Sequence, residues 1–215
     1  MAINREWLTQ KTLGGAANPT GQLMSALSRY YLKTIKADPY DPVLARELLA
    51  EAGYPDGFAV TLHSPNDRYL KDEHVANAIA VMLNDIGIET HVEAIPKSEF
   101  FKHAMNFEYS FSMSGSASPI PFDHLRDLFG SNTPDSNQGV INYAQYSNAK
   151  MDEIIRLIGK SKEQAEIEEL QREGMLMVSK NYLFIPLYHE KKTWASQFDY
   201  KIQASLGSYT PMPLS

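Results

Sequence analysis

The 215-residue sequence contains no cysteine. Disulfides, thiolate metal ligands and cysteine nucleophiles are therefore excluded together. The absence suits an oxidising compartment, where a free thiol is a liability, but many cytosolic proteins also lack cysteine. Cysteine usage by itself therefore leaves the compartment open.

Long apolar runs and basic clusters are missing as well. No run approaches the roughly 20 apolar residues that span a bilayer. The formal net charge is -6, without a cluster of Lys or Arg, and because phosphate backbones are bound by basic surfaces we expect no nucleic-acid partner. The opening MAINREWL lacks the basic and apolar regions of a secretory signal. This start predicts either a cytosolic protein or a piece of a longer one.

The motifs of common enzyme and cofactor classes are absent too. No Gly-rich phosphate loop follows a predicted strand, and the six histidines show no ligand spacing such as H-E-x-x-H. The serine-rich turn MSGSASP lacks the G-x-S-x-G form of a nucleophile elbow. We therefore expect no metal site, no cofactor and no catalytic residue.

The most regular stretch runs from Phe58 to Pro96. FAVTLHSPNDRY alternates apolar and polar residues and then breaks at Ser64-Pro65-Asn66, which predicts a strand and a polar loop. DEHVANAIAVMLNDIGI has the three- and four-residue apolar spacing of a helix, and ETHVEAIP predicts a second strand. Such a βαβ unit places its strands in parallel. Because ligands collect beyond the C-terminal ends of parallel strands, residues 64–69 form the candidate site.

The remaining elements predict an α/β fold with a central mixed or parallel sheet and helices on both faces. YSFSMSG predicts a third strand, and LFIPLYHEKKTWAS an edge or bulged strand because proline interrupts it. Residues 16–40 are expected to form an irregular connection. Further helices are expected after Asp41, over KSEFFKHAMN, after Asn148, and from a capping box at Ser161–Gln164. In the first of them, Val43, Leu44, Leu48 and Leu49 form the apolar face.

The chemistry of the loop 64–69 has two interpretations. Arg68 offers a planar, always charged fork that suits a carboxylate, and Asn66 and Tyr69 add an amide and a hydroxyl. Alternatively, Asn66 and Asp67 satisfy their own turn while Arg68 pairs with Asp67 or Asp72. The residue types alone leave both interpretations open.

Several stretches together resemble the C-terminal lobe of the peptide- and nickel-type extracellular solute-binding proteins of ABC importers. They are AINREWL, YDPVLARELLAEAGYPDGFAVTLHSPNDRY, VANAIAVMLNDIGIETHVEAIP, FFKHAM, YSNAKMDEII and LFIPLYHEKKTWA. The resemblance implies one lobe of a type II periplasmic binding protein fold. Residues 1–215 would then be the C-terminal lobe, without the N-terminal lobe and the signal peptide of the complete protein.

The resemblance also implies a function. A non-enzymatic, periplasmic or extracellular receptor would capture a short peptide between two lobes and deliver it to an ABC permease in the membrane. Its partners would be the peptide, the permease and the N-terminal lobe. Two alternatives come from other classes: the ligand-sensing domain of a transcriptional regulator, and an enzyme that uses Asp123 and His124 as a base pair.

The resemblance also implies roles for individual residues of this sequence. Arg68 matches an arginine that takes a ligand carboxylate, and Asp123, with His124 beside it, is the nearest match to an acid that meets the ligand's amino group. Asn142 and Tyr143 fall where another loop approaches the cleft, or else form a capped turn before the helix at Asn148. The turn Ser114-Gly115-Ser116-Ala117 lacks the family's tryptophan, which puts the ligand class in doubt.

Overall fold

The computed structural model describes residues 1–193, which fall into two compact units. The first unit comprises Met1–Gly21, Ala37–Gly115 and Leu187–Glu190, and the second Gln22–Lys36, Ser116–Pro186 and residues 191–193. Each unit has its own buried apolar cluster. The last residues of the stretch LFIPLYHEKKTWAS lie outside the described residues.

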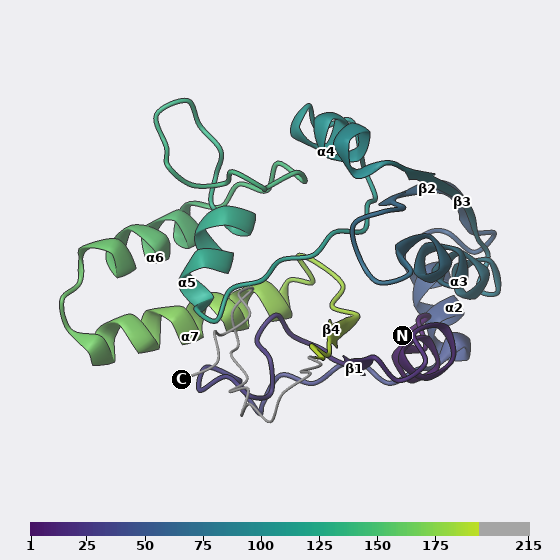
Figure 1. Cartoon of the computed structure of the whole chain (residues 1–215), viewed down its shortest axis with the longest axis horizontal. Coiled ribbons are helices and arrows are strands. Elements are labelled where there is room, and N and C mark those ends of the chain that lie inside the picture. The colour runs from purple at the N-terminus through teal and green to yellow at the C-terminus, as the bar shows by residue number, and fades with distance from the viewer. Residues whose placement is uncertain (194–215) are drawn as a thin grey trace, which may run out of the picture. The chain divides into compact units, whose positions relative to one another are not determined.

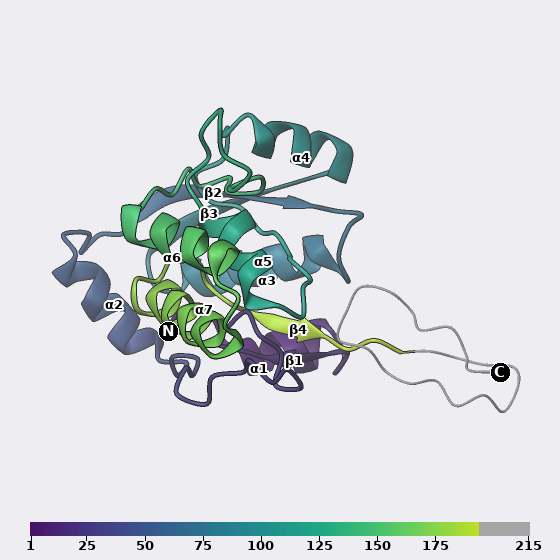
Figure 2. The ribbon, with the colours of Figure 1, turned by 90° about the vertical axis from the view of Figure 1, so that its left-hand side faces the viewer.

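The predicted βαβ unit is confirmed and forms the centre of the first unit. It consists of β2 (Phe58–Pro65), α3 (Asp72–Asn84) and β3 (Ile88–Ile95). The two strands pair in parallel from Phe58↔Ile88 to Pro65↔Ile95. Figure 2 shows α3 and α4 (Lys97–Met105) on opposite sides of this strand pair.

The spacing of apolar residues explains how α3 covers the sheet. Val75 and Ile79 are buried and pack in one cluster with Leu62 of β2, since positions three and four apart share a face of the helix. The short helix α1 (Arg5–Trp7) leads into the π-helical turn η1 (Leu8–Thr12), which adds Leu8 to the same cluster. The order of these elements can be followed in Figure 1.

Two predictions about strands need correction. Residues 16–40 are not wholly irregular, because β1 (Ala17–Pro19) pairs antiparallel with β4 (Tyr188–Glu190), the edge strand expected in LFIPLYHEKKTWAS. The third strand expected in YSFSMSG is reduced to one bridge between His63 and Ser112. The described strands thus form two two-stranded sheets rather than one central sheet, although the α/β class is as expected.

The helix α2 (Pro42–Glu51) begins where predicted but does not bury its apolar face. The Asp41 side chain accepts a hydrogen bond from the backbone N–H of Leu44 at 2.9 Å, as an N-cap does. The apolar face is left largely uncovered: Val43 is 59% and Leu48 46% exposed, and no residue of α2 is buried. Apolar spacing shows which face of a helix can be buried, whereas burial also requires an element that packs on it.

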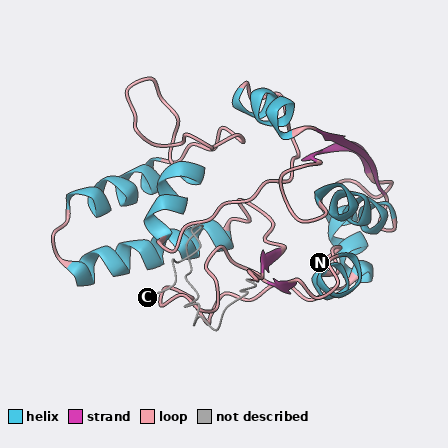
Figure 3. Ribbon diagram, in the orientation of Figure 1, coloured by secondary structure: helices cyan, strands magenta, loops and turns pink. Residues whose placement is uncertain are grey.

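The second unit is built from helices. They are α5 (Pro121–His124), the π-helical turn η2 (Leu125–Phe129), α6 (Ala149–Lys160) and α7 (Gln164–Lys180). Asn148 caps α6 as predicted, and the inward face of Met151, Ile154, Ile155 and Ile158 is buried. Figure 3 shows the segment between η2 and α6 as loop.

The predicted capping box at Ser161 is wrong. The helix α7 starts at Gln164, with Glu163 as an N-cap residue that makes no side-chain capping bond. Instead, Ser161 Oγ accepts from the backbone N–H of Glu163 at 3.2 Å and donates to Glu166 at 2.5 Å. The serine hydroxyl therefore stabilises the turn before the helix.

Among residues 1–193, no helix is long and apolar enough to cross a bilayer.

Candidate functional site

The loop 64–69 leaves the C-terminal end of β2 and enters α3, as predicted. Asn66, the first residue after β2, is tied to the neighbouring strand: its backbone N–H donates to Ile95 O at 3.0 Å, and its Nδ2 donates to Ala94 O at 3.4 Å. The Asn66 side-chain amide, which was expected to contact a ligand, therefore also holds the loop against β3.

Asp67 fixes the loop to the start of α4. Its carboxylate accepts from the backbone N–H of Lys97 at 2.7 Å and lies 3.4 Å from the Lys97 ammonium. The pKa of Asp67 is lowered, chiefly by the hydrogen bond from the Lys97 backbone, because donors and positive charge favour the ionised carboxylate. Asp67 is thus engaged with Lys97 and not with Arg68.

Asp72 closes the loop from the other end. Its side chain is buried, with the residue only 2% exposed. One oxygen accepts from the backbone N–H groups of Arg68 and Tyr69 at 2.9 and 3.0 Å, and the other from Glu73 at 3.1 Å. Two N–H groups of the loop and one of the first turn of α3 thus donate to this buried carboxylate, and the start of the helix itself favours a negative charge.

Arg68 itself has an exposed side chain. Within the described part of the chain its guanidinium makes no ion pair, and it lies 5.5 Å from the centre of the Tyr69 ring. The alternative in which Arg68 pairs with Asp67 or Asp72 is therefore wrong: Lys97 engages the first carboxylate and backbone N–H groups engage the second. Among residues 1–193, the Arg68 guanidinium is thus a planar cation without an ion-pair partner at the end of a parallel strand pair.

The hydroxyl of Tyr69 has an internal role. It accepts from the backbone N–H of Gly115 at 2.8 Å and lies 3.4 Å from Gly115 O. Burial is the main cause that raises the pKa of Tyr69. A Cβ at position 115 would lie 2.8 Å from Tyr69 Cε1, so only glycine lets the ring approach this closely. The expected contact between Tyr69 and a ligand stays a prediction.

The predicted residues Asp123 and His124 belong to α5 in the second unit. Asp123 Oδ2 accepts from Ser118 Oγ at 2.6 Å, and Asp123 Oδ1 lies 3.5 Å from Arg126. His124 is 2% exposed. Its Nε2 lies 3.1 Å from Ser118 O, which can only accept, so Nε2 donates there, and its Nδ1 lies 3.1 Å from Ser116 Oγ.

Asn142 is buried and forms the capped turn considered as an alternative. Its Nδ2 donates to Gly130 O at 2.9 Å and to Tyr146 O at 2.7 Å, while its Oδ1 accepts from the backbone N–H of Tyr146 at 3.0 Å. Both amide hydrogens and the oxygen are thus used inside the loop. Tyr143 beside it is half-buried.

The structure groups the predicted residues in two sets. Asn66, Arg68 and Tyr69 share one loop of the first unit, whereas Asp123, His124, Asn142 and Tyr143 belong to the second. Sequence reasoning missed the roles of Gly115, Ser116 and Ser118. It considered Asp72 as a partner of the Arg68 side chain, although an acid at a helix start is also the signal for bonds to backbone N–H groups.

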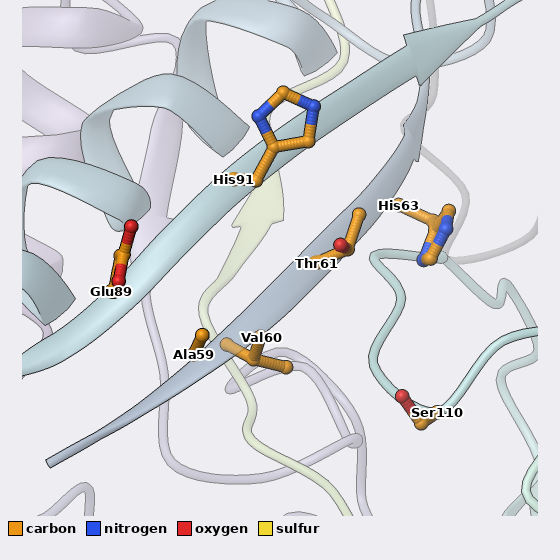
Figure 4. Close-up of a pocket in the computed structure, with 7 residues that line it drawn as sticks. All are labelled: Ala59, Val60, Thr61, His63, Glu89, His91 and Ser110. Atoms are coloured by element: carbon orange, nitrogen blue, oxygen red, sulfur yellow. The ribbon is translucent and has the colours of Figure 1, made fainter.

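A shallow depression of about 400 Å³ lies elsewhere on the first unit. It is lined by Ala59, Val60, Thr61, His63, Glu89, His91 and Ser110. Figure 4 shows these side chains along β2 and β3, with Ser110 from the segment that follows α4. His63 Nε2 lies 3.4 Å from a Glu93 carboxylate oxygen. Among residues 1–193 no group of three His, Asp or Glu could hold a metal ion.

Comparisons with known proteins agree with the fold. Over 202 residues the chain is 33% identical to the glutathione-binding protein GsiB of Shigella flexneri, covering 88% of this chain and 38% of that protein. The fold matches the periplasmic binding protein DppA of Helicobacter pylori in complex with the peptide STSA, with a TM-score of 0.77, 22% identity, and 88% and 36% of the two chains covered.

A second solved structure gives the same result. The oligopeptide-binding protein AppA of Bacillus subtilis, in complex with a nonapeptide, matches with a TM-score of 0.73 and 22% identity, covering 88% of this chain and 40% of that one. These neighbours confirm the type II periplasmic binding protein fold. The chain thus spans well under half the length of the relatives it matches.

A sequence model of one protein family matches residues 1–137 of the chain. The model describes the middle part of the bacterial extracellular solute-binding proteins, family 5. This range includes α2, the βαβ unit and the loop that carries Arg68. The chain belongs to the family 5 bacterial extracellular solute-binding proteins.

Proposed function

We propose that the chain is the peptide-capturing part of the substrate-binding component of an ABC importer. The observation that carries the proposal is the exposed Arg68 guanidinium, which makes no ion pair with any described residue although two carboxylates lie within four residues of it. A planar guanidinium binds a carboxylate through two parallel hydrogen bonds. The C-terminal carboxylate of a short peptide is the ligand group that fits it.

The relatives support this ligand class. GsiB is named as a glutathione-binding protein, and the DppA and AppA structures contain peptides. In this proposal Asp123, held by Ser118, takes the ligand's amino group, and Asn66 assists Arg68. Tyr69, His124, Asn142 and Tyr143 shape the surrounding loops. The names of these relatives describe binding proteins rather than enzymes, and none supports the regulator alternative.

The proposal includes partners and a location. The N-terminal lobe of a full-length protein would enclose the ligand by hinge closure, and the loaded protein would deliver it to a membrane permease. The family name places such proteins outside the cytoplasmic membrane. Because one lobe supplies part of the enclosure, the 215-residue chain is expected to bind its ligand weakly.

A nuclear magnetic resonance titration tests the proposal. The 215-residue chain, labelled with ¹⁵N, is titrated to millimolar concentration with glutathione and with the peptide STSA, each as the free acid. We expect chemical-shift changes at the amides of residues 66–69 with at least one of them. Arg68→Ala should abolish these changes, whereas the control Arg172→Ala, an exposed arginine paired with Glu169 on α7, should keep them. Shifts that survive in Arg68→Ala would refute the role of Arg68.

A further inference from the structure

The loop keeps two negative charges close to Arg68 without letting either neutralise it. Asp67 and Asp72 stand one and four residues away in the sequence, and either could reach the guanidinium from a relaxed loop. Asp67 is held by the backbone and ammonium of Lys97 at 2.7 and 3.4 Å. Asp72 is buried beneath the turn with three backbone N–H donors.

The bonds to Asp72 also fix the backbone that carries the guanidinium. Both Arg68 and Tyr69 donate their backbone N–H to the same oxygen of Asp72, so the two residues cannot rotate independently. The Tyr69 ring, fastened at its hydroxyl to Gly115, then lies 5.5 Å from the guanidinium carbon. A cation over an aromatic face is attracted to it. The Asp72 carboxylate therefore orients the backbone of Arg68, and the Tyr69 ring orients its side chain.

We propose that Asp72 is a positioning residue that holds the Arg68 guanidinium unpaired and oriented toward a ligand carboxylate. The proposal rests on the function proposed above. Asp72 touches no ligand in this arrangement, because its carboxylate is buried and engaged by backbone donors. Its contribution is to hold one conformation of the turn, so that binding need not order the arginine first.

Variants at position 72 separate orientation from charge. Asn keeps an oxygen that can accept from both Arg68 and Tyr69 but carries no charge, whereas Ala keeps neither. If Asp72 acts by orientation, Asp72→Asn should resemble the original chain and Asp72→Ala should resemble Arg68→Ala. If Asp72 instead acts as a competing charge, both substitutions should strengthen carboxylate binding. A purely structural role would lower stability without changing which ligand group is preferred.

The first measurement needs no ligand. Amide hydrogen exchange should be slow at Arg68 and Tyr69 in the original chain and in Asp72→Asn, and fast in Asp72→Ala, while the amide of Ile79 in the middle of α3 stays protected in all three. Rapid exchange at Arg68 and Tyr69 in the original chain would show that the bonds to Asp72 do not hold the turn, and it would overturn the inference.

The second measurement compares STSA as the free acid and as its C-terminal amide. The original chain should favour the acid by at least about tenfold, the size expected for a charge-assisted pair. Asp72→Ala should lose this preference and Asp72→Asn should retain it. An unchanged preference in Asp72→Ala, or a stronger one in both variants, refutes the positioning role alone. If the original chain has no preference while exchange at Arg68 is slow, the proposed function fails and the inference falls with it.

Discussion

The two loops that carry the predicted site residues use their polar groups in opposite ways. In the loop 64–69 the backbone is held by Asp67 and Asp72, and the Arg68 side chain is left exposed. In the loop between η2 and α6, Asn142 uses its whole amide on Gly130 and Tyr146. A side chain whose groups are all bonded internally stabilises the fold, whereas a charged side chain without a partner is available to a ligand.

The same comparison applies to the acids of each unit. Asp152, in the first turn of α6, accepts from the backbone N–H and hydroxyl of Ser131 and from Gln138 at 2.7 to 2.8 Å. Asp72 likewise accepts hydrogen bonds from backbone N–H groups. The difference is that the Asp72 bonds leave a neighbouring cation free, while the Asp152 bonds join only polar groups of the loop itself. Four predictions test how far this contrast holds.

The largest effect is expected at Asn142. Asn142→Ala removes three hydrogen bonds and leaves Gly130 O and the backbone of Tyr146 without these partners, so we expect a loss of about 3 kcal/mol in the free energy of unfolding. Urea denaturation followed by circular dichroism measures it. The control Asn181→Ala loses one exposed bond to Met177 O and should cost about 0.5 kcal/mol or less. Equal effects of the two substitutions would contradict the internal role of Asn142.

A glycine in the same loop gives the next effect. Gly139 has φ +71°, and an added Cβ would lie 2.5 Å from Gly130 O, so Gly139→Ala should destabilise by about 2 kcal/mol. Gly159 within α6 has nothing within 4 Å of an added Cβ, and Gly159→Ala should stabilise by about 0.5–1 kcal/mol because alanine favours helix. Thermal unfolding distinguishes the signs. A gain at position 139 would show that the loop can relax around the extra methyl group.

A smaller, pH-dependent effect is expected at Asp67. Its folded pKa lies below the ordinary value of 3.8, chiefly because of the Lys97 backbone N–H. The ionised form is therefore favoured by folding: this stabilisation is fully present above the ordinary value and is lost as the pH falls through the lowered pKa. A ¹³C titration of the Asp67 carboxylate should show a midpoint below 3.8. In Lys97→Met the backbone bond remains, so the midpoint should rise only in part.

The smallest effect on stability is expected at Arg68. Because the exposed guanidinium makes no ion pair with a described residue, Arg68→Ala should change the free energy of unfolding by no more than about 0.5 kcal/mol. Urea denaturation, compared with Asn142→Ala under the same conditions, measures it. A loss as large as that at Asn142 would remove the contrast between the two loops.

Local patterns in the sequence predicted the elements correctly where a single periodicity decided them. The spacing of Val75 and Ile79 predicted α3, and Asn148 predicted the start of α6, because helix faces and caps depend on residues within a few positions. The polar loop after β2 followed in the same way. Its place at the end of a parallel pair followed from the rule for βαβ units.

Tertiary structure alone decided which groups have partners. In the sequence, Asp67 and Asp72 are equally plausible ion-pair partners of Arg68. In the structure, Lys97 of another helix contacts Asp67, and the buried Asp72 accepts hydrogen bonds from the backbone. The exposure of α2 and the reduction of the expected third strand to one bridge at Ser112 also could not be read from the sequence. Periodicity fixes the face that a residue occupies, whereas its partner depends on segments far away in the chain.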